Sequence, residues 1–210
     1  MTDLALGVRR QAWGIRACGV VIGALLVALA AQVSVPLPGT PVPMTLQPMA
    51  VLLVGGLLGA RFGALSMILY LAMGAAGLPV FTPTVPLLGI TRLIGPTGGY
   101  LLAYPIAAYA TGWFSDPARK RGENPEAAAM SVNPGLAPGV RDPWGRIAFG
   151  VLVGLLLIHL GGLAQLAILT GSISSAARLA TWPFLLGDVL KLVILVPVLT
   201  RLTPTIRARL

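Results

Sequence analysis

The sequence predicts an all-α integral membrane protein, a compact bundle of six transmembrane helices that forms one domain over residues 1–210. Three observations lead to this class. Hydrophobic residues make up 56% of the chain and charged residues only 10%, whereas soluble domains carry about 25% charged residues. The mean hydropathy is +0.88. Six apolar segments follow one another along the chain, and most of the basic residues lie between them.

The six segments are assigned, in chain order, to residues 17–33, 46–60, 62–77, 98–114, 147–169 and 183–200. A spanning helix needs roughly 17–25 residues, and the first and fifth segments meet this length easily. The second and fourth segments are short, so we expect these helices to be broken or buried within the protein. No cleavable signal peptide is expected, because five further apolar segments follow the first one.

The distribution of basic residues predicts that both termini are cytoplasmic. With the N-terminus inside, 12 of the 15 Lys and Arg residues fall on the cytoplasmic side, Arg92 and Arg178 fall outside, and Lys191 lies within a span. The positive-inside rule favours this orientation. Residues 115–145, rich in Pro, Gly and charge, are expected to form a flexible cytoplasmic linker between two halves of three helices each. The net charge of +9 is attributed to membrane topology, and no nucleic-acid partner is expected.

Two loops on the outer side are unusually apolar. Residues 34–44 carry no charge and four prolines, and residues 77–99 are also rich in Pro and Gly. Exposed loops are normally polar, so these two are expected to fold back over the helix bundle as a lid. The alternative is that they are ordinary connectors at the membrane surface.

Asp188 and Lys191 lie inside the sixth segment, in the run "LLGDVLK". Residues three apart share one face of a helix, about 4.5 Å apart along its axis. Each charge costs roughly 2.5–3.5 kcal/mol at the bilayer centre, so ionisable residues at this depth are candidates for function. Two interpretations remain open. The pair forms a salt bridge that only locks the bundle, or it forms a polar site for a ligand with both donors and acceptors.

Other segments carry weaker signals. His159, in the fifth segment, is either a proton relay or a residue bonded to a neighbouring helix, and Gln47 is placed to point into a ligand cavity. The glycines of "GPTGGY", residues 95–100, allow close approach of a ligand or a helix. Ala24 and Ala28 form a small-xxx-small pattern, which lets helices pack closely within a bundle or against another protein.

Catalytic motifs are absent from the sequence. It contains no GxxxxGK[ST] loop and no HExxH motif, and it has one His and one Cys. We therefore expect no enzymatic activity, no ATP site on this chain, no metal and no cofactor.

Four stretches together resemble the BioY family, the biotin-specific S components of energy-coupling factor (ECF) transporters. They are "PVPMTLQPMAVLLVGGLLGARFG", "GAAGLPVF", "GPTGGYLLAYPIAA" and "PFLLGDVLK", and they occur in this order between about residues 35 and 191. The resemblance implies a six-helix protein of the cell membrane with biotin bound near its outer face. It also implies that the loops after the first and third spans close over the vitamin.

The resemblance further implies which residues bind biotin and which dock partners. Biotin has a ureido ring with two N–H donors and a carbonyl, an apolar bicycle and a carboxylate tail, so it matches a site of mixed polarity. A transmembrane coupling protein would dock on Ala24 and Ala28, and two ATPase subunits would drive uptake. The implied substrate-binding residues are Asp188, Lys191, Tyr100, Gln47, Gly98, Thr82 and Arg92.

Three alternatives stay open at this stage. The protein is an S component for another vitamin, a purely structural bundle, or an intramembrane enzyme that uses His159, Asp188 and Lys191. The enzyme alternative requires His159 to approach Asp188, which nothing in the sequence demands.

Overall fold

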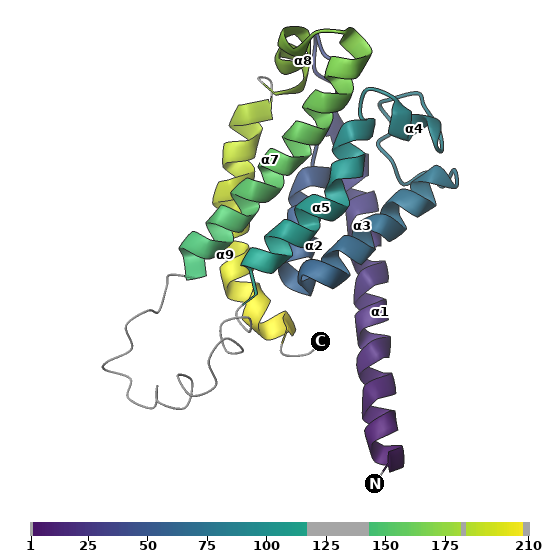
Figure 1. Ribbon diagram of the computed structural model, residues 1–210, viewed down its shortest axis with the longest axis vertical. Coiled ribbons are helices and arrows are strands. Elements are labelled where there is room, and N and C mark those ends of the chain that lie inside the picture. Colours follow the sequence, from purple (N-terminus) through teal and green to yellow (C-terminus); the bar gives the residue numbers. More distant parts are fainter. Residues whose placement is uncertain (1, 117–142, 182–183, 208–210) are drawn as a thin grey trace.

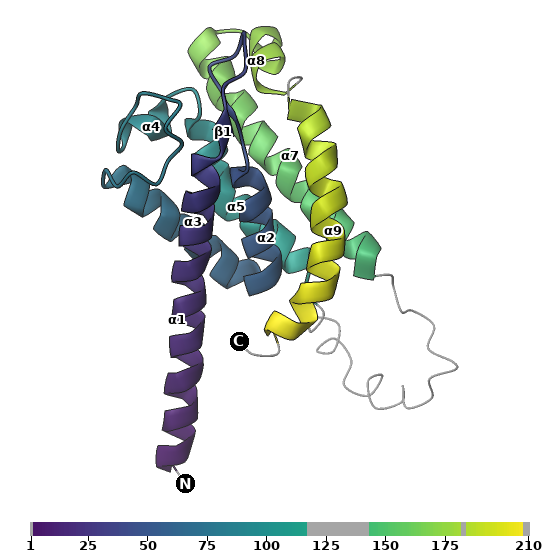
Figure 2. The same ribbon diagram turned by 180° about the vertical axis from the view of Figure 1, so that it is seen from behind.

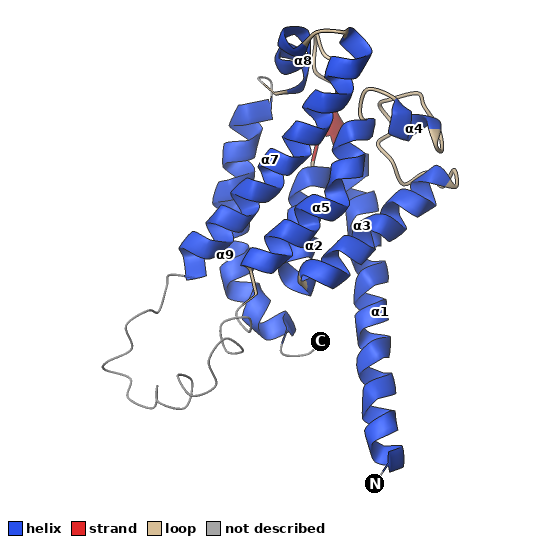
Figure 3. Cartoon of the chain, in the orientation of Figure 1, coloured by secondary structure: helices blue, strands red, loops and turns tan. Residues whose placement is uncertain are grey.

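A computed structural model describes residues 2–116, 143–181 and 184–207. The described chain is almost entirely helical, with one short antiparallel hairpin near the N-terminal third (Figure 3). Most of the predicted linker at 115–145 lies outside the described residues. The elements are α1 (Thr2–Gln32), β1 (Ser34–Val35), β2 (Met44–Thr45), α2 (Gln47–Leu58), α3 (Ala60–Ala75), α4 (Thr91–Ile94), α5 (Gly98–Phe114), α7 (Pro143–Thr170), α8 (Ile173–Ala180) and α9 (Leu185–Arg207).

Three of the described helices are long and apolar enough to cross a membrane: Trp13–Gln32, Trp144–Thr170 and Gly187–Arg207. Helices α2 and α3 are shorter and apolar. Large apolar side chains on the long helices point outward, among them Leu29, Leu156 and Val193, each more than half exposed. Lipid covers such a surface without penalty, because lipid tails are as apolar as these side chains. The chain is thus a multi-pass membrane protein.

Helix α5 occupies the middle of the bundle, where it packs against α2, α3 and α7. Glycines make the closest of these contacts possible. A Cβ atom added to Gly99 would lie 2.0 Å from the carbonyl oxygen of Gly161 on α7, and one added to Gly161 would lie 2.4 Å from that of Gly99. One added to Gly55 of α2 would lie 2.4 Å from the Ala108 carbonyl oxygen. Small residues let membrane helices approach this closely, so van der Waals packing of backbones holds the bundle together.

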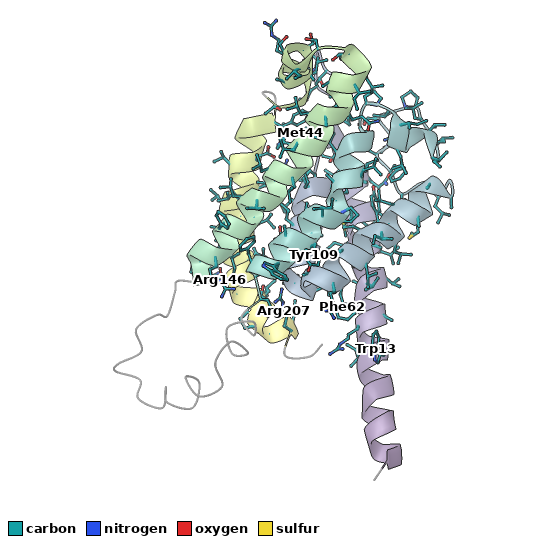
Figure 4. The ribbon with its side chains drawn as sticks, viewed as in Figure 1. Trp13, Met44, Phe62, Tyr109, Arg146 and Arg207 are labelled. Atoms are coloured by element: carbon teal, nitrogen blue, oxygen red, sulfur yellow. The ribbon has the colours of Figure 1, made fainter. Side chains whose placement is uncertain are left out.

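The two ends of the bundle differ in structure. The hairpin, α4 and α8 gather at one end, and the first turns of α1 and the last turns of α9 lie toward the other end (Figures 1 and 2). The first half of α1 extends away from the other helices (Figure 2). Met44 of the hairpin therefore lies far from Arg207 of α9 (Figure 4).

Arg207 joins three helices at the end that is opposite to the hairpin. Its Nη2 donates hydrogen bonds to the Gly56 carbonyl at 2.7 Å and the Gly112 carbonyl at 3.1 Å, and its Nη1 lies 3.3 Å from an Asp116 oxygen. The last carbonyls of a helix have no partner within that helix. One partly buried guanidinium on α9 thus donates to carbonyls near the C-terminal ends of α2 and α5.

The two loops that were predicted to fold over the bundle are each hydrogen-bonded to a helix. Thr40 Oγ1, in the hairpin turn, donates to the Leu179 carbonyl of α8 at 2.8 Å. Gln32, at the end of α1, donates to the Phe81 carbonyl at 3.4 Å. Hydropathy did not predict the hairpin, α4 or α8, because each is a short element held by contacts of this kind.

Candidate ligand-binding site

A cavity lies between the helices and these loops, with about 600 Å³ of empty space, part of it open to the outside. Ligand sites for small molecules commonly combine apolar walls with a few polar groups. This cavity has that character. Its walls are Val42, Pro43, Thr45, Gln47, Pro48, Phe81, Thr82, Arg92, Thr97, Tyr100, Leu101, Tyr104, Leu155, Ile158, His159, Phe184, Asp188 and Lys191.

Asp188 is the centre of a three-residue polar cluster in the cavity wall. Lys191 donates from Nζ to Asp188 Oδ1 at 2.8 Å, along the same face of α9. His159 Nε2, from α7, contacts Asp188 Oδ2. Asp188 and Lys191 are both at least nine-tenths buried. The carboxylate therefore bridges two helices as well as two basic side chains.

Aromatic rings surround His159 on the cavity side. The centroids of the Tyr100 and Phe184 rings each lie 6.3 Å from the centroid of the imidazole ring. Gly162, on α7, provides the room for Tyr100, because a Cβ atom there would lie 2.1 Å from the phenol ring. These contacts fix the orientation of the imidazole ring while they give the cavity an apolar wall.

Arg92 is a buried cation in the part of the cavity wall that the loops form. Its side chain is 1% exposed. Its Nη1 donates to the carbonyls of Val85 and Leu87, and its Nη2 donates to the Thr82 carbonyl. Burial lowers the pKa of the Arg92 guanidinium from its ordinary value. Among the described residues, no carboxylate forms an ion pair with it. An anion that entered the cavity would supply the missing charge.

Gln47 connects the start of α2 to α3 and to the loop after α3. Its Nε2 donates to Tyr70 Oη, and the Tyr70 hydroxyl donates in turn to the Val80 carbonyl at 3.2 Å. Thr82, two residues further along the loop, faces the same cavity. Its Oγ1 lies 3.0 Å from Thr84 Oγ1. Ordinary hydrogen bonds thus hold this part of the wall in a defined shape.

The structure brings together six of the seven residues that were predicted to bind substrate: Asp188, Lys191, Tyr100, Gln47, Thr82 and Arg92 all line the cavity. Gly98 does not. It begins α5 against the preceding turn, where an added Cβ atom would lie 1.8 Å from the Leu93 carbonyl oxygen. The missing side chain of Gly98 thus makes room for the backbone of the preceding turn and does not line the cavity.

Ala24 and Ala28 face into the bundle. Ala24 is 0% exposed and Ala28 is 8% exposed, and both belong to the hydrophobic core. The small-xxx-small pattern therefore serves packing within the chain in this structure. An exposed docking face at these positions is not what the structure shows, because α1 packs this side against α2 and α3.

His159 lines the cavity although it was not among the residues predicted to bind substrate, and its bond to α9 matches the prediction of a contact with a neighbouring helix. The sequence feature that singles out His159 also identified Asp188 and Lys191: each is an ionisable residue within an apolar segment. The sequence does not reveal how α7 is rotated relative to α9, so it did not place His159 against Asp188. The contact meets the geometric condition of the enzyme alternative.

The fold and the site define a multi-pass membrane protein with an internal cavity for a small molecule of mixed polarity. Residues 9–208 match the model of the BioY family, and the chain belongs to that family. The family is one of transporters, so the protein is not an enzyme.

Curated relatives carry the same family name. "Biotin transporter BioY" of Rhodobacter capsulatus is 36% identical over 172 residues, which cover 81% of this chain and 83% of that protein. "Biotin transporter BioY" of Thermotoga maritima is 32% identical over 84% of this chain and 89% of that protein. "Probable biotin transporter BioY" of Pyrococcus horikoshii is 45% identical over 87 residues, and this match spans about half of that protein, 51%.

A solved structure shares the fold. It is the crystal structure of the S-component for biotin from an ECF-type ABC transporter, and it superposes with a TM-score of 0.72 over 91% of this chain and 92% of that chain. The two sequences are 24% identical. At this identity, the likeness establishes the architecture and leaves the ligand to be argued from the site.

Proposed function

We propose that this protein binds biotin in the cavity and mediates its uptake across the membrane. One observation carries the proposal. In a chain of the BioY family, a buried Asp188–Lys191 pair lines the same cavity as a buried Arg92 that pairs with no carboxylate of the described residues. A ligand with a neutral polar head and an acidic tail complements these groups.

The two polar regions of the cavity come from different sides of the protein. Asp188 and Lys191 belong to α9, and Arg92 belongs to α4, and these helices lie on opposite sides of the bundle (Figures 1 and 2). We assign the ureido ring to the Asp188 side, where the carboxylate accepts from one ureido N–H group and Lys191 donates to the carbonyl. The biotin carboxylate is assigned to the Arg92 side. The rings of Tyr100 and Phe184 offer apolar surface to the bicycle.

We also propose the membrane arrangement that the sequence predicts: six spans in a single domain, with both termini in the cytoplasm. The six helices α1, α2, α3, α5, α7 and α9 are the spans, and the end of the bundle with the hairpin, α4 and α8 faces outward. Reporter fusions at each terminus test this arrangement. A C-terminal reporter that is active only outside the cytoplasm would contradict it.

We propose further that a transmembrane coupling protein and two ATPase subunits energise uptake, as the resemblance to S components implies. The absence of a Walker loop from this sequence supports such a division of labour. Docking through Ala24 would require α1 to shift against its neighbours, because Ala24 has no exposed surface. Co-purification of the tagged chain with these subunits from a native membrane tests the partnership.

Binding of radiolabelled biotin to the purified protein tests the ligand and its orientation together. Wild type is compared with Asp188→Asn, Lys191→Ala and Arg92→Gln, and each variant is titrated with biotin and with its methyl ester. Truncation of one partner of a buried charge pair costs about 2–5 kcal/mol or more, so the first two variants should lose at least about 30-fold in affinity.

The methyl ester lacks the negative charge of the biotin carboxylate, so it shows which residues interact with that end of the ligand. It should bind wild type more weakly than biotin does, and Arg92→Gln should remove most of that difference. Asp188→Asn should weaken both ligands alike. No binding of biotin by wild type would refute the proposed function, and an ester preference that survives Arg92→Gln would refute the orientation.

A further inference from the structure

Both oxygens of the Asp188 carboxylate are held, and each is held by a different helix. Oδ1 accepts from Lys191 Nζ on α9 at 2.8 Å, and Oδ2 is bonded to His159 Nε2 on α7. An ionised carboxylate has about four acceptor positions, two on each oxygen. Among the residues that the structure describes, these are the bonds to the carboxylate, so each oxygen keeps a position for a ligand.

The chemistry of this contact fixes the role of the imidazole. An ionised carboxylate only accepts hydrogen bonds, so His159 must donate its Nε2 proton to Asp188. The other ring nitrogen, Nδ1, is buried and has no hydrogen-bond partner among the described residues. In the neutral ring, Nδ1 carries no proton and leaves no donor unsatisfied. The structure is thus consistent with a neutral imidazole that donates from Nε2.

Lys191 alone does not hold the carboxylate in one rotation. The terminal torsion of an Asp side chain is broad, and the Lys191 ammonium sits on a long flexible stem. His159 differs, because its ring is planar, comes from another helix and is enclosed by Tyr100 and Phe184. A contact from such a ring fixes the second oxygen and with it the plane of the carboxylate.

We infer that His159 is a positioning residue for ligand recognition, which holds Asp188 so that a free acceptor position of its carboxylate faces one N–H group of a cyclic urea. This inference rests on the proposed function, biotin binding in the same cavity. It adds a residue that acts through Asp188 and does not need to touch the ligand. It also explains why a buried carboxylate here has two basic partners when one would balance its charge.

Three substitutions at position 159 separate donation from packing. His159→Gln keeps an N–H donor at about the reach of Nε2, His159→Asn has its donor nearer to the backbone, and His159→Leu has none. A hydrogen bond to a charged group contributes about 1.5–3 kcal/mol, so Leu and Asn should weaken biotin binding by about 10- to 150-fold. Gln should stay within about threefold of wild type. Thr200→Val, on α9 but away from the cavity, serves as the matched control and should bind as wild type does.

A ligand analogue supplies a measurement that a packing defect would not produce. Of the two biotin analogues that are methylated on one ureido nitrogen, one has lost the donor that Asp188 is inferred to meet. That analogue should bind wild type weakly, and His159→Leu or His159→Asn should weaken it by much less than they weaken biotin. Thermal unfolding of each purified variant, followed by tryptophan fluorescence, identifies the variants that fold, and His159→Asn decides the matter if the Leu variant does not.

The outcomes distinguish this inference from the proposed function. If wild type does not bind biotin, the proposed function fails. If wild type binds and the folded Leu or Asn variant binds as tightly, the function stands and the positioning role of His159 is overturned. Equal losses for biotin and that N-methyl analogue would also overturn it, as would a folded Gln variant that binds no better than Asn.

Discussion

The Asp188–Lys191 pair makes a quantitative prediction about stability that is separate from binding. Asp188→Asn keeps an acceptor for His159 but removes the negative charge, so Lys191 is left as a buried cation. The Lys191 side chain is 9% exposed and its Nζ lies 2.8 Å from Oδ1. The variant therefore tests what this charge pair contributes to the folded protein.

Coulomb's law sets the scale of the effect. With an effective dielectric constant of about 20, two unit charges separated by the observed 2.8 Å attract by roughly 6 kcal/mol. Desolvation of both charges offsets part of this attraction, and loss of one partner of a buried pair typically costs about 3–5 kcal/mol. For a protein of 150–250 residues, each kcal/mol lowers the melting temperature by about 2–4 °C. We expect Asp188→Asn to melt about 6–20 °C below wild type.

A double-mutant cycle shows whether the charge pair is the cause. Lys191→Met should destabilise less than Asp188→Asn, because His159 still donates to the carboxylate. The double variant Asp188→Asn/Lys191→Met contains no buried charge at this site. Replacement of a buried ion pair by neutral groups is often nearly neutral for stability, so the double variant should melt above Asp188→Asn and close to wild type.

The assay is thermal unfolding of the purified protein in detergent without ligand, with biotin binding measured on the same samples. Binding should be lost in the double variant although stability returns. A double variant that is destabilised by the sum of the two single effects would show that the residues contribute independently. That result would refute the coupling argued here.

Contacts elsewhere in the bundle lead to three more expected outcomes. Gly162→Ala places a methyl group against the Tyr100 ring, and since overpacking costs about 1–3 kcal/mol, biotin affinity should fall about 5- to 150-fold in a titration. Arg207→Gln leaves the ends of α2 and α5 without their donor, so melting should fall by roughly 2–12 °C while biotin affinity is kept. Thr40→Val removes the bond to the Leu179 carbonyl, so bound biotin should dissociate about 2- to 10-fold faster in a chase experiment. Unchanged values in any of these measurements would contradict the contact concerned.

The all-helical class and the long helices were predictable because lipid and protein interiors are both apolar. A helix such as α7 (Pro143–Thr170) is hydrophobic along its whole length, and the sequence prediction placed a span at 147–169. The ends of α1 and α9 were harder to predict, since both helices continue beyond the apolar segment. The hairpin, α4 and α8 are stabilised by single tertiary bonds, such as Thr40 to Leu179, that no local pattern encodes.

Some residues of the candidate site could likewise be predicted from the sequence, and others could not. Asp188 and Lys191 were identified because buried charges are costly and therefore rare, and the structure places both in the cavity wall. Ala24 and Ala28 were harder to interpret, since close packing within a chain and close packing between chains use the same small residues. Gly98 was grouped with the ligand site although its missing side chain serves the turn before α5.

The charges around the cavity connect the loops to the ligand. The charged residues that line it are Asp188, Lys191 and Arg92, so with a neutral His159 the described wall carries one net positive charge. A buried charge without a partner is unfavourable, and a ligand with one carboxylate would neutralise the site. Arg92 also holds the carbonyls of Thr82, Val85 and Leu87, so the group that needs the anion is the group that shapes the loop. Entry of an anionic ligand and closure of this loop should therefore favour each other, and a neutral ligand should lack that coupling.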